Sequence, residues 1–132
     1  MLKNIFIIGF CIWNVVLLIQ IGIEVSAVTP EQAMLEGVTQ RIYASITTLD
    51  YIMATLWGVI LISILTASKE WFLRAAFLYV GFFLCDIHFN FYMSVEMNEP
   101  EWIIEPLLYV FVQILFIAWA DKQINVSNYA YD

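Results

Sequence analysis

Apolar residues run along this chain in four long blocks that are separated by shorter polar stretches. The blocks cover residues 5–23, about 49–67, 72–92 and about 102–119. An α-helix needs about 20 largely apolar residues to cross the hydrocarbon core of a bilayer. We therefore predict an all-α membrane protein with four transmembrane helices. Because the polar turn between the last two blocks is short, we expect an antiparallel bundle.

The segment 24–48, between the first two blocks, is longer than a tight connection requires. In "TPEQ", Thr29 fits an N-cap, Pro30 the first helical position and Gln32 the capping-box position. Apolar residues then recur at helical spacing: Met34, Leu35, Val38, Ile42 and Ile46. A single helix over 30–67 would be about 57 Å long, which predicts a bend near Gly37 or Thr47–Thr48. We expect an extra helical segment that either lies on the membrane surface or projects from the second span.

The first apolar block has a second interpretation, as a secretory signal. Lys3 provides a short positive region, and "VSA" before Val28 resembles a cleavage site. The apolar run is longer than the usual 7–15 residues of a signal core. We therefore interpret it as a membrane span.

The composition supports a lipid environment. Hydrophobic residues make up 63% of the chain, charged residues 13%, and the mean hydropathy is +0.85. Soluble domains contain about 45–50% apolar and about 25% charged residues. We expect residues 1–132 to form one integral membrane domain in contact with lipid. The formal charge of −7 and the lack of a basic patch argue against nucleic acid as a partner.

The charged residues predict an orientation. Four spans place four of the five basic residues on one side: Lys3, Lys69, Arg74 and Lys122, with Arg41 opposite. The positive-inside rule then predicts that both termini are cytoplasmic. In the tail 120–132, the polar end "INVSNYAYD" (residues 124–132) is expected to fray. The outer side collects most of the acidic residues: Glu24, Glu31, Glu36, Asp50, Glu96, Glu99 and Glu101.

Polar residues interrupt the third block in "CDIHFNFYM", residues 85–93. An ionisable side chain at the centre of a spanning helix costs about 2.5–3.5 kcal/mol, so it normally faces protein or water. At about 100° per residue, Asp86 shares a face with Asn90, whereas His88 points to nearly the opposite side with Cys85. The stretch therefore predicts two polar stripes, each of which needs a partner.

The fourth block carries Glu105, Tyr109 and Gln113 on one face, at spacings of four residues. The turn "NEPE" at 98–101 is short, so Glu105 should lie at a depth similar to that of residues 88–90. We predict a contact between Glu105 and either His88 or Asn90.

Other residues are candidates for helix packing. Asn14 and Gln20 lie on different faces of the first span, and amides of this kind often join membrane helices. Ala54 and Gly58 form a small-xxx-small pair in the second span.

The polar residues of spans three and four allow two interpretations. Asp86, His88, Asn90, Glu105 and Gln113 either hold the bundle and its partners together or form a proton or cation site below the acidic outer side. A metal site is the weakest option, because its soft ligands would be His88, Cys85 and Met93, with only one histidine in the chain. Cys11 and Cys85 lie in apolar blocks and predict no disulfide. No cofactor is expected.

Catalytic motifs are absent from the sequence: there is no GxSxG, HExxH, P-loop or GxGxxG. We therefore expect no enzyme. The preferred interpretation is a small accessory subunit that packs against other membrane subunits or against itself. The alternative is a small homo-oligomeric transporter or channel for protons or cations that uses Asp86 and Glu105. A second alternative is a membrane-active or immunity-type protein of viral or plasmid origin.

Overall fold

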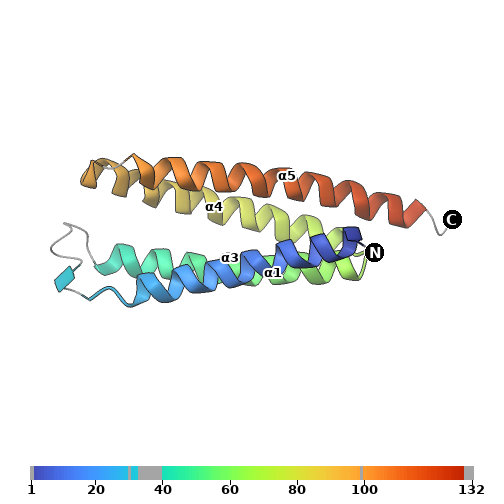
Figure 1. Ribbon diagram of the computed structural model, residues 1–132, viewed down its shortest axis with the longest axis horizontal. Helices are drawn as coiled ribbons and strands as arrows, with labels where there is room; N and C mark the ends of the chain where they lie inside the picture. Colours follow the sequence, from blue (N-terminus) through green and yellow to red (C-terminus); the bar gives the residue numbers. More distant parts are fainter. Residues whose placement is uncertain (1, 30, 33–39, 99, 130–132) are drawn as a thin grey trace.

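The protein is a bundle of long α-helices. The computed structural model describes residues 2–29, 31–32, 40–98 and 100–129. Its helices are α1 (Leu2–Ser26), α3 (Gln40–Leu65), α4 (Lys69–Met97) and α5 (Glu101–Tyr129), and the described residues contain no strand. Each helix runs antiparallel to the one before it and packs against it along the chain (Figure 1). The predicted all-α antiparallel bundle is confirmed.

Each helix contains a segment long and apolar enough to cross a membrane. These segments are Asn4–Ser26, Tyr43–Leu65, Lys69–Val95 and Ile103–Ile124. Large apolar side chains face outward, as lipid requires; Phe77 is 79% exposed and Leu108 64%. The chain is therefore a small multi-pass integral membrane protein, as its apolar blocks predicted.

The helix α3 begins at Gln40, well before the apolar block that predicted it. Tyr43 and Ile46 are buried on the same side as Met53, so the helical face that packs inward continues across residues 43–53. Of the segment 24–48, residues 40–48 extend the second span as part of α3, in line with one of the two arrangements considered. Thr29 and Gln32 form the expected capping box: the Thr29 N–H donates to Gln32 Oε1 (3.0 Å) and the Gln32 N–H to Thr29 Oγ1 (3.3 Å). Met34, Leu35 and Val38 lie outside the described residues.

The helix α5 continues beyond the predicted end of the fourth span to Tyr129. The polar tail 124–132 was expected to fray, but its residues 124–129 are helical. Ala120 and Ile124 are buried one turn apart. Their burial in the core extends the helix past its apolar block.

The turns that follow α3 and α4 each contain one residue in a left-handed backbone conformation. Asn98 has φ 55° and donates its N–H toward the carbonyls of Ser94 and Val95. Between α3 and α4, Ala67 has φ 52°, and the Ser68 N–H donates to the Ser63 carbonyl at 2.9 Å. Such bonds satisfy the last carbonyls of a helix while the chain turns back. Short turns therefore make α3 and α4, and then α4 and α5, neighbours.

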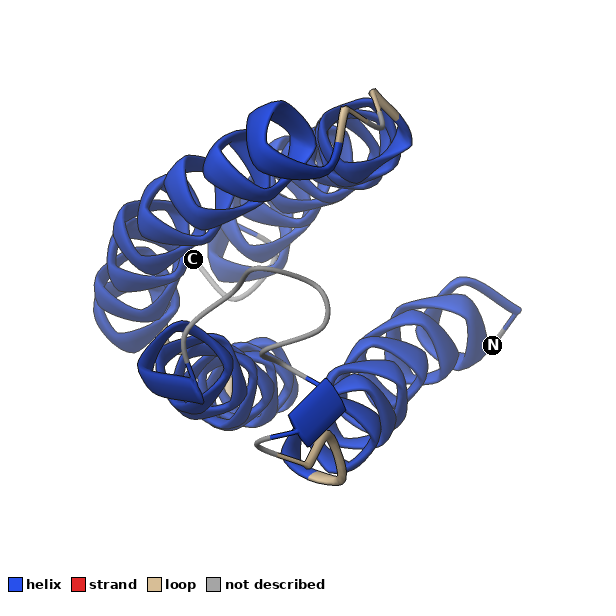
Figure 2. Cartoon of the chain, turned by 90° about the vertical axis from the view of Figure 1, so that its left-hand side faces the viewer, coloured by secondary structure: helices blue, strands red, loops and turns tan. Residues whose placement is uncertain are grey.

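The bundle has two different ends. The terminal end holds the start of α1, the turn between α3 and α4, and the end of α5; the far end holds the turn between α4 and α5 (Figure 1). From the short turn at the terminal end, α3 and α4 spread apart toward the far end (Figure 1). Figure 2 looks onto the far end, where α1 lies well apart from the α4–α5 pair.

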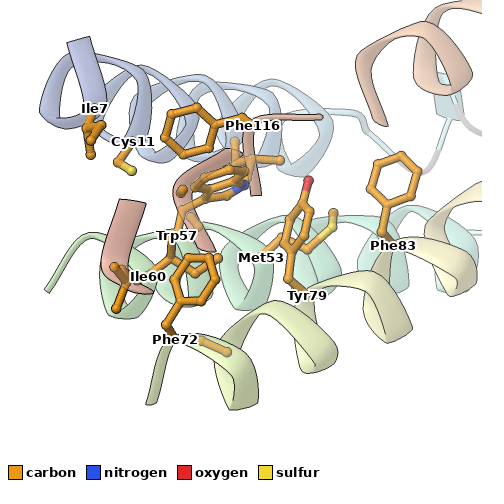
Figure 3. Packing of buried hydrophobic residues seen from close by; sticks show 14 of the residues in the cluster. Ile7, Cys11, Met53, Trp57, Ile60, Phe72, Tyr79, Phe83 and Phe116 are labelled. Atoms are coloured by element: carbon orange, nitrogen blue, oxygen red, sulfur yellow. The ribbon is translucent and has the colours of Figure 1, made fainter. Parts of the chain in front are cut away.

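The core is aromatic and fills the middle of the bundle (Figure 3). Trp57 and Tyr79 are completely buried, with ring centroids 5.2 Å apart in an edge-to-face arrangement. Phe116 of α5 packs on the same indole at 5.8 Å. Aromatic pairs of this kind contribute about 0.5–1.5 kcal/mol beyond the area they bury. The core thus joins α3, α4 and α5 and leaves the far end less filled.

Candidate functional site

A cavity of about 410 Å³ lies between the four helices at the far end. Small-molecule pockets in proteins measure about 300–1,000 Å³, so the cavity has the size of a ligand site. Most of its wall is apolar. The α1 side is formed by Leu17, Leu18, Ile21 and Val25, and α3 adds Tyr43, Ile46, Asp50 and Met53. The remaining wall comes from α4 and α5: Phe83, Asp86, Asn90, Glu105, Pro106 and Tyr109.

Three carboxyl side chains line this cavity. Asp50 of α3 is only 4% exposed and Asp86 of α4 only 8%, whereas Glu105 of α5 is exposed. Asp86 Oδ2 accepts a hydrogen bond from Asn90 Nδ2 at 3.1 Å, and the two aspartates are close enough to interact electrostatically. Asp50 Oδ2 is buried and has no hydrogen-bond partner within the described part of the chain. The described lining residues include no basic side chain.

The burial of Asp50 follows from the phase of α3. Tyr43, Ile46, Met53 and Trp57 are buried at spacings of three, seven and four residues, and Asp50 falls on the same helical face. From the sequence, Asp50 was counted only among the acidic residues of the outer side; in the structure it lies buried in the cavity wall. The helical spacing of its apolar neighbours was the signal that could have identified it.

A buried polar cluster closes the cavity toward the middle of the bundle. Asn14 Oδ1 accepts hydrogen bonds from Gln113 Nε2 (2.7 Å) and from the Tyr109 hydroxyl. Asn14 Nδ2 donates to the Phe10 carbonyl of its own helix at 2.8 Å. We call Asn14, Tyr109 and Gln113 the amide latch. It joins α1 to α5, two helices that do not pack along their lengths.

Next to the latch, three aromatic rings fill the middle of the bundle and close the cavity further. Phe10 stacks on Phe116 with centroids 4.2 Å apart, and both lie 5.8 Å from Trp57 (Figure 3 shows Trp57 and Phe116). We call these three residues the aromatic plug. On its other side, at the terminal end, a second cavity of about 310 Å³ is lined by residues of α1, α3 and α5 and by Ala67. The plug and the latch separate the two cavities.

The structure brings together some of the predicted site residues and separates others. Asp86, Asn90 and Glu105 line the same cavity, and Gln113 belongs to the latch below it. The hydrogen bonds of Asn90 go to the Asp86 carbonyl (2.9 Å) and carboxylate. His88 is exposed on another side of α4 and does not line the cavity.

The weak candidates for a metal site do not face a common space. Met93 is completely buried, whereas Cys85 and His88 are exposed. Across the described ranges, no three His, Cys, Asp or Glu side chains gather closely enough to hold a metal ion.

The residues predicted to pack helices together have different environments. Ala54 is buried, but a Cβ at Gly58 would meet nothing within 4 Å. Gln20 is exposed and donates to Glu24 of the same helix at 3.0 Å. A closer approach, which was not predicted from the sequence, occurs at Gly22, where a Cβ would lie 3.1 Å from the Tyr51 ring.

No protein-family model, curated protein or solved structure matches this chain. The class defined by the fold is that of a small four-helix membrane protein, and its site is an acidic, largely apolar cavity at the far end.

Proposed function

We propose that this protein is a small membrane carrier that binds a cation, a proton included, in the far-end cavity. The observation that supports this is Asp50, a carboxyl group that is only 4% exposed and has an oxygen without a partner in the described part of the chain. Leaving a polar group buried and unpaired costs about 1–3 kcal/mol. Inside a membrane, ionisable residues of this kind commonly mark ion or substrate pathways.

The other acidic groups near the cavity also support the binding of a cation. Asp86 and Glu105 line the cavity with Asp50, and the described lining residues offer them no basic partner. A cation that enters would be attracted by all three carboxyl groups. Glu24, Glu31 and Glu101 near the far end would also raise the local concentration of cations.

The plug and the latch favour a carrier over an open channel. Phe10, Trp57 and Phe116 fill the middle of the bundle, between one cavity at each end. Carriers expose a site near the middle of the membrane to one side and then to the other as their halves rock against each other. We call the line along which α1 and α5 face each other the seam. It suits such a motion, because the two helices do not pack along their lengths and are joined there mainly by side chains.

We propose that the far-end cavity opens away from the cytoplasm. Lys69, Arg74 and Lys122 belong to the terminal end of the bundle, and the positive-inside rule assigns that end to the cytoplasm. Both chain termini would then be cytoplasmic.

Cation flux in liposomes tests the proposal. The purified protein would be reconstituted, and the flux of H⁺, Na⁺, K⁺ and an organic ammonium ion measured separately. We expect flux of one of these ions, lowered about tenfold or more by Asp50→Asn or Asp86→Asn because a buried charge partner is lost. Glu70→Gln, an exposed carboxyl at the terminal end, is the matched control. Flux that is absent for every ion, or unchanged in both aspartate variants, would refute the carrier.

An accessory subunit is the second candidate, and the surface of α5 favours it. Only 17% of the residues in the spanning window of α5 are buried, the lowest share of the four spans. Its exposed apolar side chains include Ile104, Leu108, Phe111 and Leu115. A larger membrane subunit or a second copy could cover this face. Native gel migration in mild detergent tests it: a stable lone monomer from native membranes argues against an accessory role.

A further inference from the structure

We propose that the cation taken by the far-end cavity is an organic amphiphile, in which one ammonium group is attached to an apolar body. This inference rests on the proposed function and names the substrate class of the same site. It follows from how the chemistry of the cavity is distributed among its walls.

One wall of the cavity, that of α1, is entirely aliphatic, and the carboxyl groups come from the other three helices. Asp50 and Asp86 lie on the neighbouring helices α3 and α4, whereas α1 contributes only aliphatic side chains, such as Leu18 and Ile21. A ligand that satisfies both walls has a positive group at one end and an apolar group at the other. Asp50, buried with an unpartnered oxygen, supplies the contact for the positive end.

The size and the donor set of the cavity argue against a bare metal ion. Hard cations are held by about six to eight oxygen ligands at close range. No three His, Cys, Asp or Glu groups among the described residues lie close enough to hold a metal ion. A volume of about 410 Å³ also greatly exceeds the space that one ion needs and falls in the range of organic ligands.

Aromatic side chains add a second means of recognising an ammonium group. Tyr43, Phe83 and Tyr109 line the cavity together with the carboxyl groups. The face of an aromatic ring attracts a cation by about 0.5–2 kcal/mol, depending on solvation, and quaternary ammonium groups are commonly recognised in this way. Such a group needs no hydrogen-bond acceptor, so a carboxylate with aromatic neighbours suffices.

The position of the seam gives such a ligand a route from the lipid. Toward the far end, beyond the latch, Leu17 of α1 and Pro106 of α5 line the cavity, and their helices do not pack along their lengths there. Figure 2 shows the separation of α1 from the α4–α5 pair at this end. An amphiphile dissolved in the outer part of the bilayer would reach the carboxyl groups between α1 and α5.

Binding of a matched pair of probes tests the inference. Benzyltrimethylammonium and neopentylbenzene have the same shape, and only the first carries a charge. Binding to the protein in nanodiscs would be measured by calorimetry, with empty nanodiscs to correct for partition into lipid. We expect saturable binding of the cation, at least about tenfold tighter than that of the neutral probe because a buried charge pair forms.

Variants separate the roles of the two walls. Asp50→Asn should weaken binding of the cation about tenfold or more and leave binding of the neutral probe unchanged. Glu70→Gln, an equal change of charge at the terminal end of the bundle, should have little effect. Ile21→Trp fills the cavity and should abolish binding of the organic cation with all three carboxyl groups in place. If Asp50→Asn does not fold, Asp86→Asn takes its place.

The outcomes distinguish this inference from the proposed function. Asp50-dependent flux of Na⁺, K⁺ or H⁺ without binding of benzyltrimethylammonium would refute an amphiphilic ligand. It would still support the proposal that the protein is a cation carrier. Equal binding of both probes, unaffected by Asp50→Asn, would overturn recognition of the charge. Binding that survives Ile21→Trp would place the ligand elsewhere and would also overturn the inference.

Discussion

Asn14 is the residue on which the closure between α1 and α5 depends. Its single side-chain oxygen accepts hydrogen bonds from both Tyr109 and Gln113, and it is completely buried. Interhelical hydrogen bonds in membranes contribute about 0.6–2 kcal/mol each. Because α1 and α5 lack extended backbone packing, these bonds are a large part of what joins them.

Replacing the Asn14 amide by an apolar group of similar size should destabilise the bundle. Asn14→Leu leaves the buried Gln113 amide and the half-buried Tyr109 hydroxyl without their acceptor, and we expect a loss of about 1–3 kcal/mol in the free energy of unfolding. Reversible unfolding in mixed micelles, titrated with a denaturing detergent, measures this loss. Combining it with Gln113→Leu should cost less than the sum of the two changes, because one orphaned donor disappears.

Gln20→Leu provides the matched control for Asn14→Leu. Gln20 is an amide on the same helix, but it is exposed and bonds only locally to Glu24. We expect a change within about 0.5 kcal/mol. Equal losses at the two positions would show that the latch does not hold α1 to α5.

At the scale of elements, the packing of α1 on α3 is closest at Gly22. A Cβ at this position would lie 3.1–3.2 Å from the ring of Tyr51, and 3.5 Å from Asp50 Cβ. Contacts this short force the neighbouring side chain to move. The glycine thus lets α1 approach α3 directly beside the wall of the far-end cavity.

A larger side chain at Gly22 should therefore push α1 away from α3. We expect Gly22→Leu to destabilise the protein by about 1–3 kcal/mol, as overpacking commonly does. Gly58→Leu is the control, since a Cβ there meets nothing within 4 Å, and it should be neutral or stabilising. Thermal unfolding in detergent compares the two variants. Addition of Tyr51→Ala should recover much of the loss at Gly22; no recovery would mean that the steric explanation is wrong.

The whole molecule consists of two helix pairs that are tied together by an aromatic core and separated toward the far end. α3 and α4 share a short turn and a continuous core, whereas α1 and α5 do not pack along their lengths and are joined mainly through side chains. The bundle is therefore closed on one side and held by the plug and latch on the other. One ligand-sized cavity at each end is the consequence of this asymmetry.

The antiparallel order also predicts which residues can be reached from each side of a membrane. Glu70 at the start of α4 and Glu101 at the start of α5 are both exposed and lie at opposite ends of the bundle. In a background without Cys11 and Cys85, Glu70→Cys should react with an impermeant maleimide only from the cytoplasmic side, and Glu101→Cys only from the other side. Tags at residues 1 and 132 should both be reached from the cytoplasm. Labelling of both cysteines from one side would refute four spans.

Much of the fold could be predicted from the sequence. A helix that crosses a bilayer must be largely apolar over the thickness of the hydrocarbon core, so apolar blocks of that length identify the spans. The ends of the helices were less predictable. α3 starts at Gln40 and α5 continues to Tyr129, since burial of Tyr43 and of Ile124 extends each helix beyond its apolar block. Of the candidate site, Asp86, Asn90 and Glu105 were identified by polarity, whereas Asp50 was counted only among the acidic residues of the outer side.

The sequence by itself determined that the chain crosses a membrane four times with helices in antiparallel order, because hydropathy and length are properties of each segment alone. Only the tertiary structure decided which polar groups meet. Asn14 and Gln113 are 99 residues apart in the chain and share a hydrogen bond, and Asp50 faces the same cavity as Asp86 and Glu105. The rotation of each helix about its axis sets these contacts, and that rotation is fixed by the packing of neighbouring helices rather than by any one segment.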